Sequence, residues 1–207
     1  MASFKDSFFS KLSGKVGNVN TYILNGKQVV RANPIPNDPK TPKQLAHRMK
    51  FALVNKGLSP LNRSIKLGHR DDTNAYRSLV GKAYREAIVG EYPDYKLDYS
   101  KLVIANGNLQ PPSNIKLEMD VETNSALFWW DKQNLDSLKP SRNSDQLNIV
   151  VFNVKHNVAD HISEIAKRSD SKISIVLPVG WSLVDIHFWA YFSSHTLQMN
   201  SVSVYIL

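Results

Sequence analysis

One local cluster of side chains has the residue types that bind a metal ion. His156, Asp160, His161 and Glu164 lie within nine residues, and one helical turn would bring the last three together. The two histidines are five residues apart, whereas a metallohydrolase helix places them four apart. The spacing favours a polar loop between strands over a metal site. We therefore predict no metal and no cofactor.

A second group contains the residue types of a nucleophilic triad. Asp185, His187 and His195 lie close in the sequence to Ser193 or Ser194, and strand alternation would put Asp185 and His187 on one face. A triad also needs a strained nucleophile turn and an oxyanion hole, and the surrounding sequence has the signature of neither. We expect a structural strand with a polar face, in a protein that is not an enzyme.

Positive charge is the most informative chemical feature. Twelve Lys and Arg, but only one acidic residue, Asp38, lie from Lys11 to Arg70, and the whole chain has a formal net charge of +8. Such a concentrated field attracts polyanions and acidic protein surfaces. The candidate binding residues for such a partner lie on one side of an expected helix and further along the chain, and they are Lys43, His47, Lys50, Arg63, Lys66 and Arg70.

The elements that carry these residues have clear local signals. Two β-favouring runs, residues 19–24 and 27–32, flank Asn25-Gly26 and predict a hairpin with a type I′ turn. Thr41-Pro42 predicts a helix start, and this helix should end at Gly57. A short helix should follow from residue 59 to about 67, and a third should precede Gly90.

The first of these helices is predicted to be amphipathic. At 100° per residue, an apolar arc forms from Leu45, Met49, Ala52 and Leu53, and the basic side lies opposite it. We expect the apolar arc to pack against the rest of the protein. Lys43, His47 and Lys50 would then face the solvent.

The second half of the chain has a different pattern. Segments of strand length with alternating apolar residues cover residues 115–119, 125–130, 146–154, 172–177, 185–193 and 201–206. We predict an α+β protein in which residues 1–110 form a hairpin plus three-helix module and residues 111–207 form a β-sandwich. Trp189 and Tyr191 share one face of a late strand, and we predict that they form an exposed contact face.

The strand spacing and a tryptophan in an early strand, Trp129 or Trp130, resemble a fibronectin type III or immunoglobulin-like module. The whole chain is similar to an uncharacterised family of unknown function common in Bacteroidetes, through residues 14–18, 26–31, 41–51 and 90–93. That resemblance implies an α/β module joined to a β-sandwich, and no assigned activity. Residues 37–44 are also similar to a run in phage and prophage proteins.

Two functions fit these observations. The first is a structural or interaction protein, such as a virion or surface-assembly component, that binds a protein partner or assembles with itself. The second is a nucleic-acid-binding protein without sequence readout, whose affinity should fall steeply with salt. We expect neither a signal peptide nor a membrane span, and therefore a soluble protein that is cytoplasmic or virion-associated, because no apolar run is long enough.

Overall fold

The computed structural model describes residues 2–4, 12–35, 38, 40–70, 72–120, 122–132, 134–135, 139–181 and 185–206, with the backbone alone for residues 2–4. Contacts divide the chain into two compact units, Met1–Thr41 and Pro42–Leu207. This division differs from the predicted boundary near residue 110. The physical reason lies in the second unit, where the helices share a core with the sheet that follows them.

The first unit is a four-stranded antiparallel sheet in the order β1-β4-β3-β2. Its strands are β1 (Ala2–Phe4), β2 (Gly14–Val16), β3 (Val19–Leu24) and β4 (Lys27–Ala32). Asn25 and Gly26 have φ values of 51° and 74°, which is the left-handed conformation that a type I′ turn requires. Tyr22 pairs with Val29 and Thr21 with Val30. The predicted hairpin and its register are confirmed.

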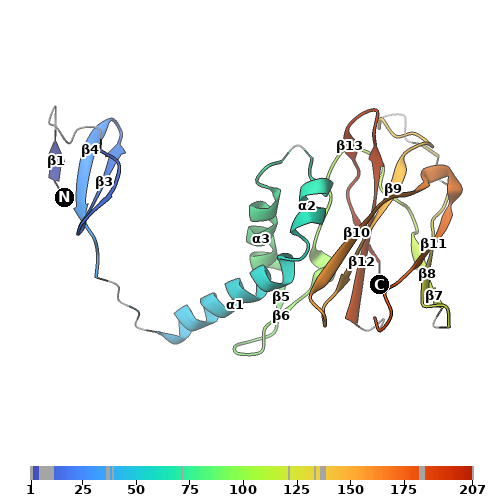
Figure 1. Ribbon diagram of the computed structural model, residues 1–207, viewed down its shortest axis with the longest axis horizontal. Coiled ribbons are helices and arrows are strands. Elements are labelled where there is room, and N and C mark those ends of the chain that lie inside the picture. The colour runs from blue at the N-terminus through green and yellow to red at the C-terminus, as the bar shows by residue number, and fades with distance from the viewer. Residues whose placement is uncertain are drawn as a thin grey trace. The chain divides into compact units, whose positions relative to one another are not determined.

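The second unit begins with the three predicted helices, α1 (Pro42–Leu58), α2 (Asn62–Gly68) and α3 (Ala75–Glu86) (Figure 1). Gly68 ends α2 where the chain passes very close to the segment after α3. A Cβ atom at Gly68 would lie 2.5 Å from the carbonyl oxygen of Ile104, so only glycine fits. Gly57 lies inside α1 instead of ending it.

Three antiparallel sheets follow in the second unit. A five-stranded sheet has the order β10-β9-β12-β13, with β14 also paired to β12, and a three-stranded sheet has the order β11-β8-β7. A two-stranded ribbon joins β5 (Ile88–Val89) to β6 (Lys96–Leu97). The strands of the two larger sheets are β7 (Lys116–Asp120), β8 (Ser125–Trp129), β9 (Gln146–Asn153), β10 (Val158–Lys167), β11 (Lys172–Val176), β12 (Ile186–Ser194), β13 (Met199–Asn200) and β14 (Val204–Ile206).

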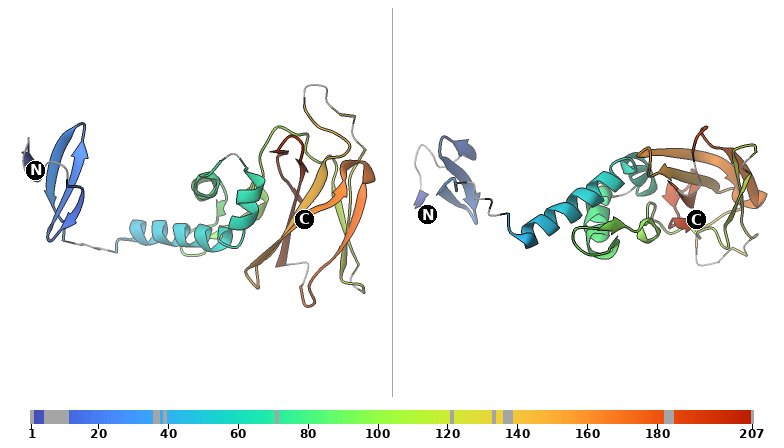
Figure 2. Two further views of the ribbon diagram at one scale, coloured as in Figure 1. Left: turned by 45° about the horizontal axis from the view of Figure 1, so that its top comes forward. Right: turned by 90° about the horizontal axis from the view of Figure 1, so that it is seen from below.

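The five-stranded sheet is covered on both faces. Ile186, Phe188, Ala190 and Phe192 of β12 point into a core shared with the three-stranded sheet. The alternate residues of β12 point into a second core, which is shared with the three helices. The helices lie on one side of the five-stranded sheet, and β7, β8 and β11 lie on the other (Figure 1, Figure 2). The unit therefore has a helical layer, a five-stranded sheet and a three-stranded sheet, in that order.

This arrangement overturns one prediction. Trp189 is 0% exposed and Tyr191 is 2% exposed, because the helical layer covers the face on which they lie. The Trp189 indole N–H donates a hydrogen bond to the Leu102 carbonyl, 3.0 Å away. The prediction of an exposed contact face at these two residues is wrong. They are structural core residues.

Strand β10 falls where a polar loop was predicted. It pairs with β9, but its register shifts between Ile162 and Ala166, and Glu164 has a φ of 58° at the shift. Such a bulge interrupts the apolar alternation that marks a strand in sequence. The loop prediction for residues 160–164 is therefore wrong, for a reason that lies in the backbone.

Candidate functional site

The candidate residues on α1 face the body of the second unit instead of the solvent alone. The His47 ring lies 5.2 Å from the Tyr84 ring of α3, and the Lys50 ammonium lies 4.7 Å above the Tyr95 ring. Lys43 is exposed at the first turn. Lys50 is half-buried beside an aromatic ring, so the predicted solvent-facing side is wrong for Lys50, whereas the exposed Lys43 and His47 agree with it.

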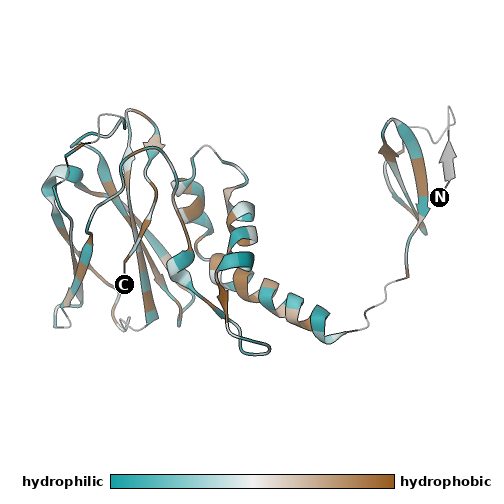
Figure 3. Cartoon of the chain, turned by 180° about the vertical axis from the view of Figure 1, so that it is seen from behind, coloured by the Kyte–Doolittle hydropathy of each residue, from teal (hydrophilic) through white to brown (hydrophobic). Residues whose placement is uncertain are grey.

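The predicted apolar arc of α1 is correspondingly exposed. Leu45 is 36% exposed and Met49 is 39% exposed, and Phe51, on another side of the helix, is 52% exposed. Only Val54, Gly57 and Leu58 of α1 are buried. A Cβ atom at Gly57 would lie 2.6 Å from a methyl of the Leu97 side chain, so this glycine allows close packing at the last turns. Figure 3 shows hydrophobic and hydrophilic bands along the same helix.

The candidate residues on α2 and just after it lie near other elements. Arg63 is close enough to His161 of β10 for its charge to act on that ring, and the Arg70 guanidinium donates to the Gln198 side chain, 2.9 Å away. Arg63 and Lys66 are exposed. Three of the six predicted residues thus contact other elements: His47 and Lys50 contact tyrosine rings, and Arg70 contacts Gln198. The role of all six in binding stays a prediction.

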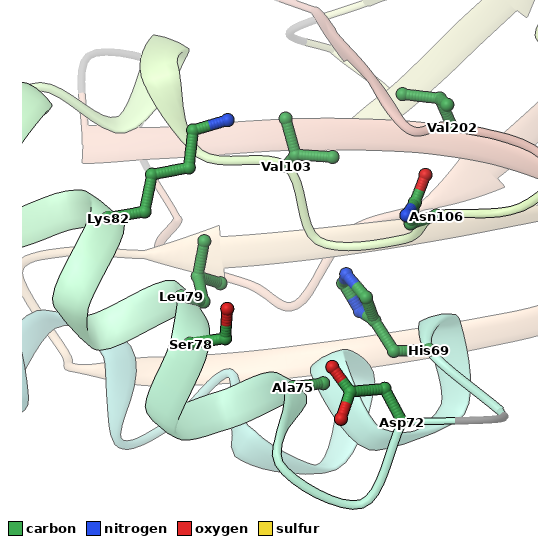
Figure 4. A pocket seen from close by; sticks show the side chains of 9 residues that line it. All are labelled: His69, Asp72, Ala75, Ser78, Leu79, Lys82, Val103, Asn106 and Val202. Atoms are coloured by element: carbon green, nitrogen blue, oxygen red, sulfur yellow. The ribbon is translucent and has the colours of Figure 1, made fainter.

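A groove lies between α3 and the segment that follows η1 (Tyr99–Lys101). It has a volume of about 380 Å³, and α3 contributes Ala75, Ser78, Leu79 and Lys82, at the spacing of one helix face. His69, Asp72 and Asn106 continue into an adjoining hollow of about 260 Å³. Figure 4 shows the Lys82 ammonium at one end and the Asp72 carboxylate at the other.

The polar groups of this groove are fixed by the backbone. Nδ1 of His69 lies 3.1 Å from the Ile65 carbonyl oxygen, which can only accept, so Nδ1 carries hydrogen and Nε2 is the acceptor of the neutral ring. Oδ1 of Asp72 accepts from the Asn74 backbone N–H at 2.8 Å. The described side chains here can hydrogen-bond a polar ligand, and their observed hydrogen bonds run to backbone groups instead of forming a nucleophile–base pair.

The residues with the types of a nucleophilic triad do not converge. Nδ1 of His187 is 2.6 Å from the Tyr205 hydroxyl, Ser193 accepts from the Asn148 side chain at 2.8 Å, and His195 pairs with Glu164. The residues of the metal-type cluster are likewise dispersed. Nε2 of His161 is 3.1 Å from the Tyr191 hydroxyl, and His156 contacts Asn153. Within the described ranges, no group of three or more metal-ligating side chains is found.

Two of these histidines predict a pH dependence of stability. Burial lowers the pKa of His161, the charge of Arg63 lowers it further, and the charge of Asp160 opposes the shift. Burial also lowers the pKa of His187, and the charge of Asp98 opposes that shift. The unfolded chain therefore binds protons more readily than the folded chain. Stability should fall as the pH decreases below about 6.5, the ordinary histidine value, and should level off below the folded-state pKa values.

Urea unfolding of the wild type and of H161Q/H187Q, at about pH 7.5 and 5.5, tests this dependence. The wild type should lose more stability on acidification than the double variant does. Equal acid losses in the wild type and H161Q/H187Q would contradict the assignment.

A feature that the sequence reasoning missed lies on the first unit. Lys15 of β2 pairs with Asn20 of β3, and Asn20 pairs with Arg31 of β4, so the three side chains form a row across one face. Tyr22 lies on the same face, beside the row. These four residues line a hollow of about 470 Å³. The alternation of the predicted hairpin contained the signal for β3 and β4, because Asn20 and Arg31 are opposite each other in its register.

Together, these features define a mixed α/β protein, with three α-helices and several antiparallel sheets among the residues that the structure describes. No helix in the described part of the chain is both long and apolar enough to span a membrane. The chain belongs to a family whose description is "Family of unknown function (DUF6266)", and the match covers residues 11–207. The predicted resemblance to an uncharacterised family is confirmed to that extent.

Comparison with other proteins adds little to this membership. No curated protein matches the chain. The crystal structure of a Fn3-like protein from Clostridium thermocellum is similar over 48% of this chain and 93% of that chain, with 14% identity and a TM-score of 0.31. A similarity of that size carries no functional argument.

Proposed function

We propose that the protein is a non-enzymatic interaction protein that binds an acidic protein partner through α1. The observation that carries this proposal is the surface of that helix. Leu45 and Met49 expose more than a third of their area although they are at the spacing of a packing face. Exposed apolar side chains that cluster on one element often mark an interface.

The charge of α1 indicates the chemistry of the partner. Between Pro42 and Leu58 the helix has two lysines and an arginine besides Lys43, and it has no acidic residue. A second copy of the same helix would bring like charges together, which disfavours self-association through this face. An acidic helix with apolar residues at the same spacing would cover both the charge and the apolar area.

Fluorescence anisotropy with a labelled synthetic helix of about 20 residues, with Leu on one face and Glu elsewhere, tests the proposal. The full chain should bind this peptide, and L45S/M49S should bind it at least about tenfold more weakly, because two apolar anchors are lost. The matched control is V176S/V179S, which removes two apolar side chains that are 77% and 97% exposed elsewhere. This control should bind as tightly as the wild type.

Two results would overturn the proposal. One is an absence of binding to the acidic peptide at low salt. The other is equal weakening by L45S/M49S and by the control, because binding would then not depend on α1. A peptide with Lys in place of Glu should bind neither the wild type nor the variants.

Two finer statements belong to the same proposal. We infer that the five-stranded and three-stranded sheets form a sandwich of the immunoglobulin or fibronectin III kind, and the support is the core that they share, with Phe128 and Phe188 in edge-to-face contact at 5.4 Å. A virion or surface-assembly component is the version of this function that the similarity of residues 37–44 to phage proteins favours.

A further inference from the structure

The first unit has a cationic face and an apolar face. In the register of its sheet, Lys15, Asn20 and Arg31 lie directly across three neighbouring strands. Neighbouring strands are about 5 Å apart, so the backbones that carry the two cations are separated by about 10 Å, with the Asn20 amide between them. The opposite face carries the apolar side chains Val16, Val19, Ile23 and Val30.

In the described part of the first unit, neither cation of the row has an acidic neighbour on this face. Asp38 is the only acidic side chain among residues 12–41, and it lies beyond the last strand. Lys15 and Arg31 are both exposed. Two cations held near each other repel, and an anion placed between them relieves that repulsion. The Asn20 amide can add a hydrogen bond to the same anion.

The hollow beside the row has an aromatic side chain as well as the cations. Tyr22 follows Asn20 by two residues, so its ring lies on the same face, where it pairs with the buried Val29 and remains half-exposed. A base can stack on such a ring while the phosphates on either side contact cations. A protein carboxylate would use the cations but would leave the ring without a specific partner.

We propose that this face of the first unit binds single-stranded nucleic acid, with Lys15 and Arg31 on the phosphates and a base stacked on Tyr22. The site is sequence-independent, because backbone phosphates and stacking carry no base code. It lies in a different compact unit from α1 and has a different ligand class. The experiments therefore test this site independently of the proposed binding of an acidic protein.

The test is fluorescence anisotropy of the full chain with a labelled oligothymidylate of about 20 nucleotides, at about 50 and 200 mM NaCl. The charge-matched variants are K15Q/R31Q, which removes the row, and K27Q/K40Q, which removes two positive charges of the same unit outside the hollow. K15Q/R31Q should bind at least about tenfold more weakly, and its salt slope should fall by about 1.4, the value for two lost phosphate contacts. K27Q/K40Q should change both quantities less.

Tyr22 is tested by a different readout. Y22L should weaken binding by about fivefold to a hundredfold without changing the salt slope, because stacking releases no counterions. Far-UV circular dichroism and the urea midpoint of each variant show whether it is folded. L45S/M49S should bind the oligonucleotide like the wild type, which separates this site from the one on α1.

Three outcomes would overturn the inference. The first is the absence of wild-type binding at the lower salt concentration. The second is an equal loss in the two charge-matched variants, which would show that only the overall field acts. The third is competition by polyglutamate as effective, charge for charge, as competition by unlabelled oligothymidylate, because the site would then recognise any polyanion.

Discussion

Replacing Arg168 by methionine should lower the free energy of unfolding by about 3–5 kcal/mol, because it leaves a buried carboxylate without its ionic partner. The side chains of Arg168 and Asp145 are 3% and 1% exposed, and Nη2 of the arginine is 3.2 Å from Oδ2 of the aspartate. The same guanidinium donates to the Gln110 carbonyl at 2.7 Å and lies 3.8 Å above the Phe192 ring. The lost contacts therefore include hydrogen bonds and packing as well as charge.

The double variant D145L/R168M separates these contributions. It removes both charges, so it should be more stable than R168M alone, although the hydrogen bonds from Arg168 to the Gln110 carbonyl and from the Arg142 backbone N–H to Asp145 are both lost. Urea unfolding followed by circular dichroism measures both variants against the wild type. Exposed Arg142, changed to methionine, is the control and should cost little. A wild-type midpoint for R168M would show that the ion pair does not stabilise the fold.

Truncation of Trp189 to alanine should lower the free energy of unfolding by about 3–5 kcal/mol, because a large side chain is removed from a closed core. Trp189 is 0% exposed and contacts the rings of Tyr99 and Tyr205, with centroids 6.5 and 5.5 Å away. W189F should cost less, since it keeps most of the packing but leaves the Leu102 carbonyl without a hydrogen bond.

Trp129 provides the matched control for this truncation. It lies on β8 and is half-buried, so W129A removes the same side chain from a more open position. Urea unfolding should rank the variants with W189A least stable, then W189F, with W129A closest to the wild type. Similar midpoints for W189A and W129A would contradict the location of Trp189 in the core between the helices and the sheet.

Local signals in the sequence predicted the elements that are bounded by characteristic turn and helix-capping residues. Asn25-Gly26 fixed the hairpin register because a type I′ turn permits only one pairing. Thr41-Pro42 marked the start of α1, and apolar alternation located β9 and β12 within one or two residues. Each of these features depends on residues close together in the chain, which is why sequence alone could locate them.

Contacts between distant residues decided what could not be predicted. Alternation along β12 separates His187, Trp189 and Tyr191 from the opposite face, but it does not say that the helices cover them. Periodicity in α1 identifies an apolar arc, but the close approach of Gly57 to Leu97 selects a different side for packing. The bulge at Glu164 likewise arises from the backbone.

Contacts between distant residues also limited the prediction of the candidate sites. Charge counting identified the basic segment correctly, since Lys11 to Arg70 is depleted of acidic residues. It could not show that Lys50 lies over Tyr95, or that Arg70 reaches Gln198 from a distant turn. The row across β2, β3 and β4 required the additional pairing of β2, a strand of three residues that the sequence did not reveal.

The double-sided burial of β12 has a practical consequence. The apolar even-numbered residues of β12 belong to the core with the three-stranded sheet, and Trp189 and Tyr191 belong to the core with the helices. Both cores therefore depend on the same strand. A shortened protein that starts at residue 111 would uncover Val150, Phe152, Trp189 and Tyr191 together. That bare aromatic surface would drive the fragment into inclusion bodies during expression, whereas a fragment that starts at Pro42 keeps the surface covered.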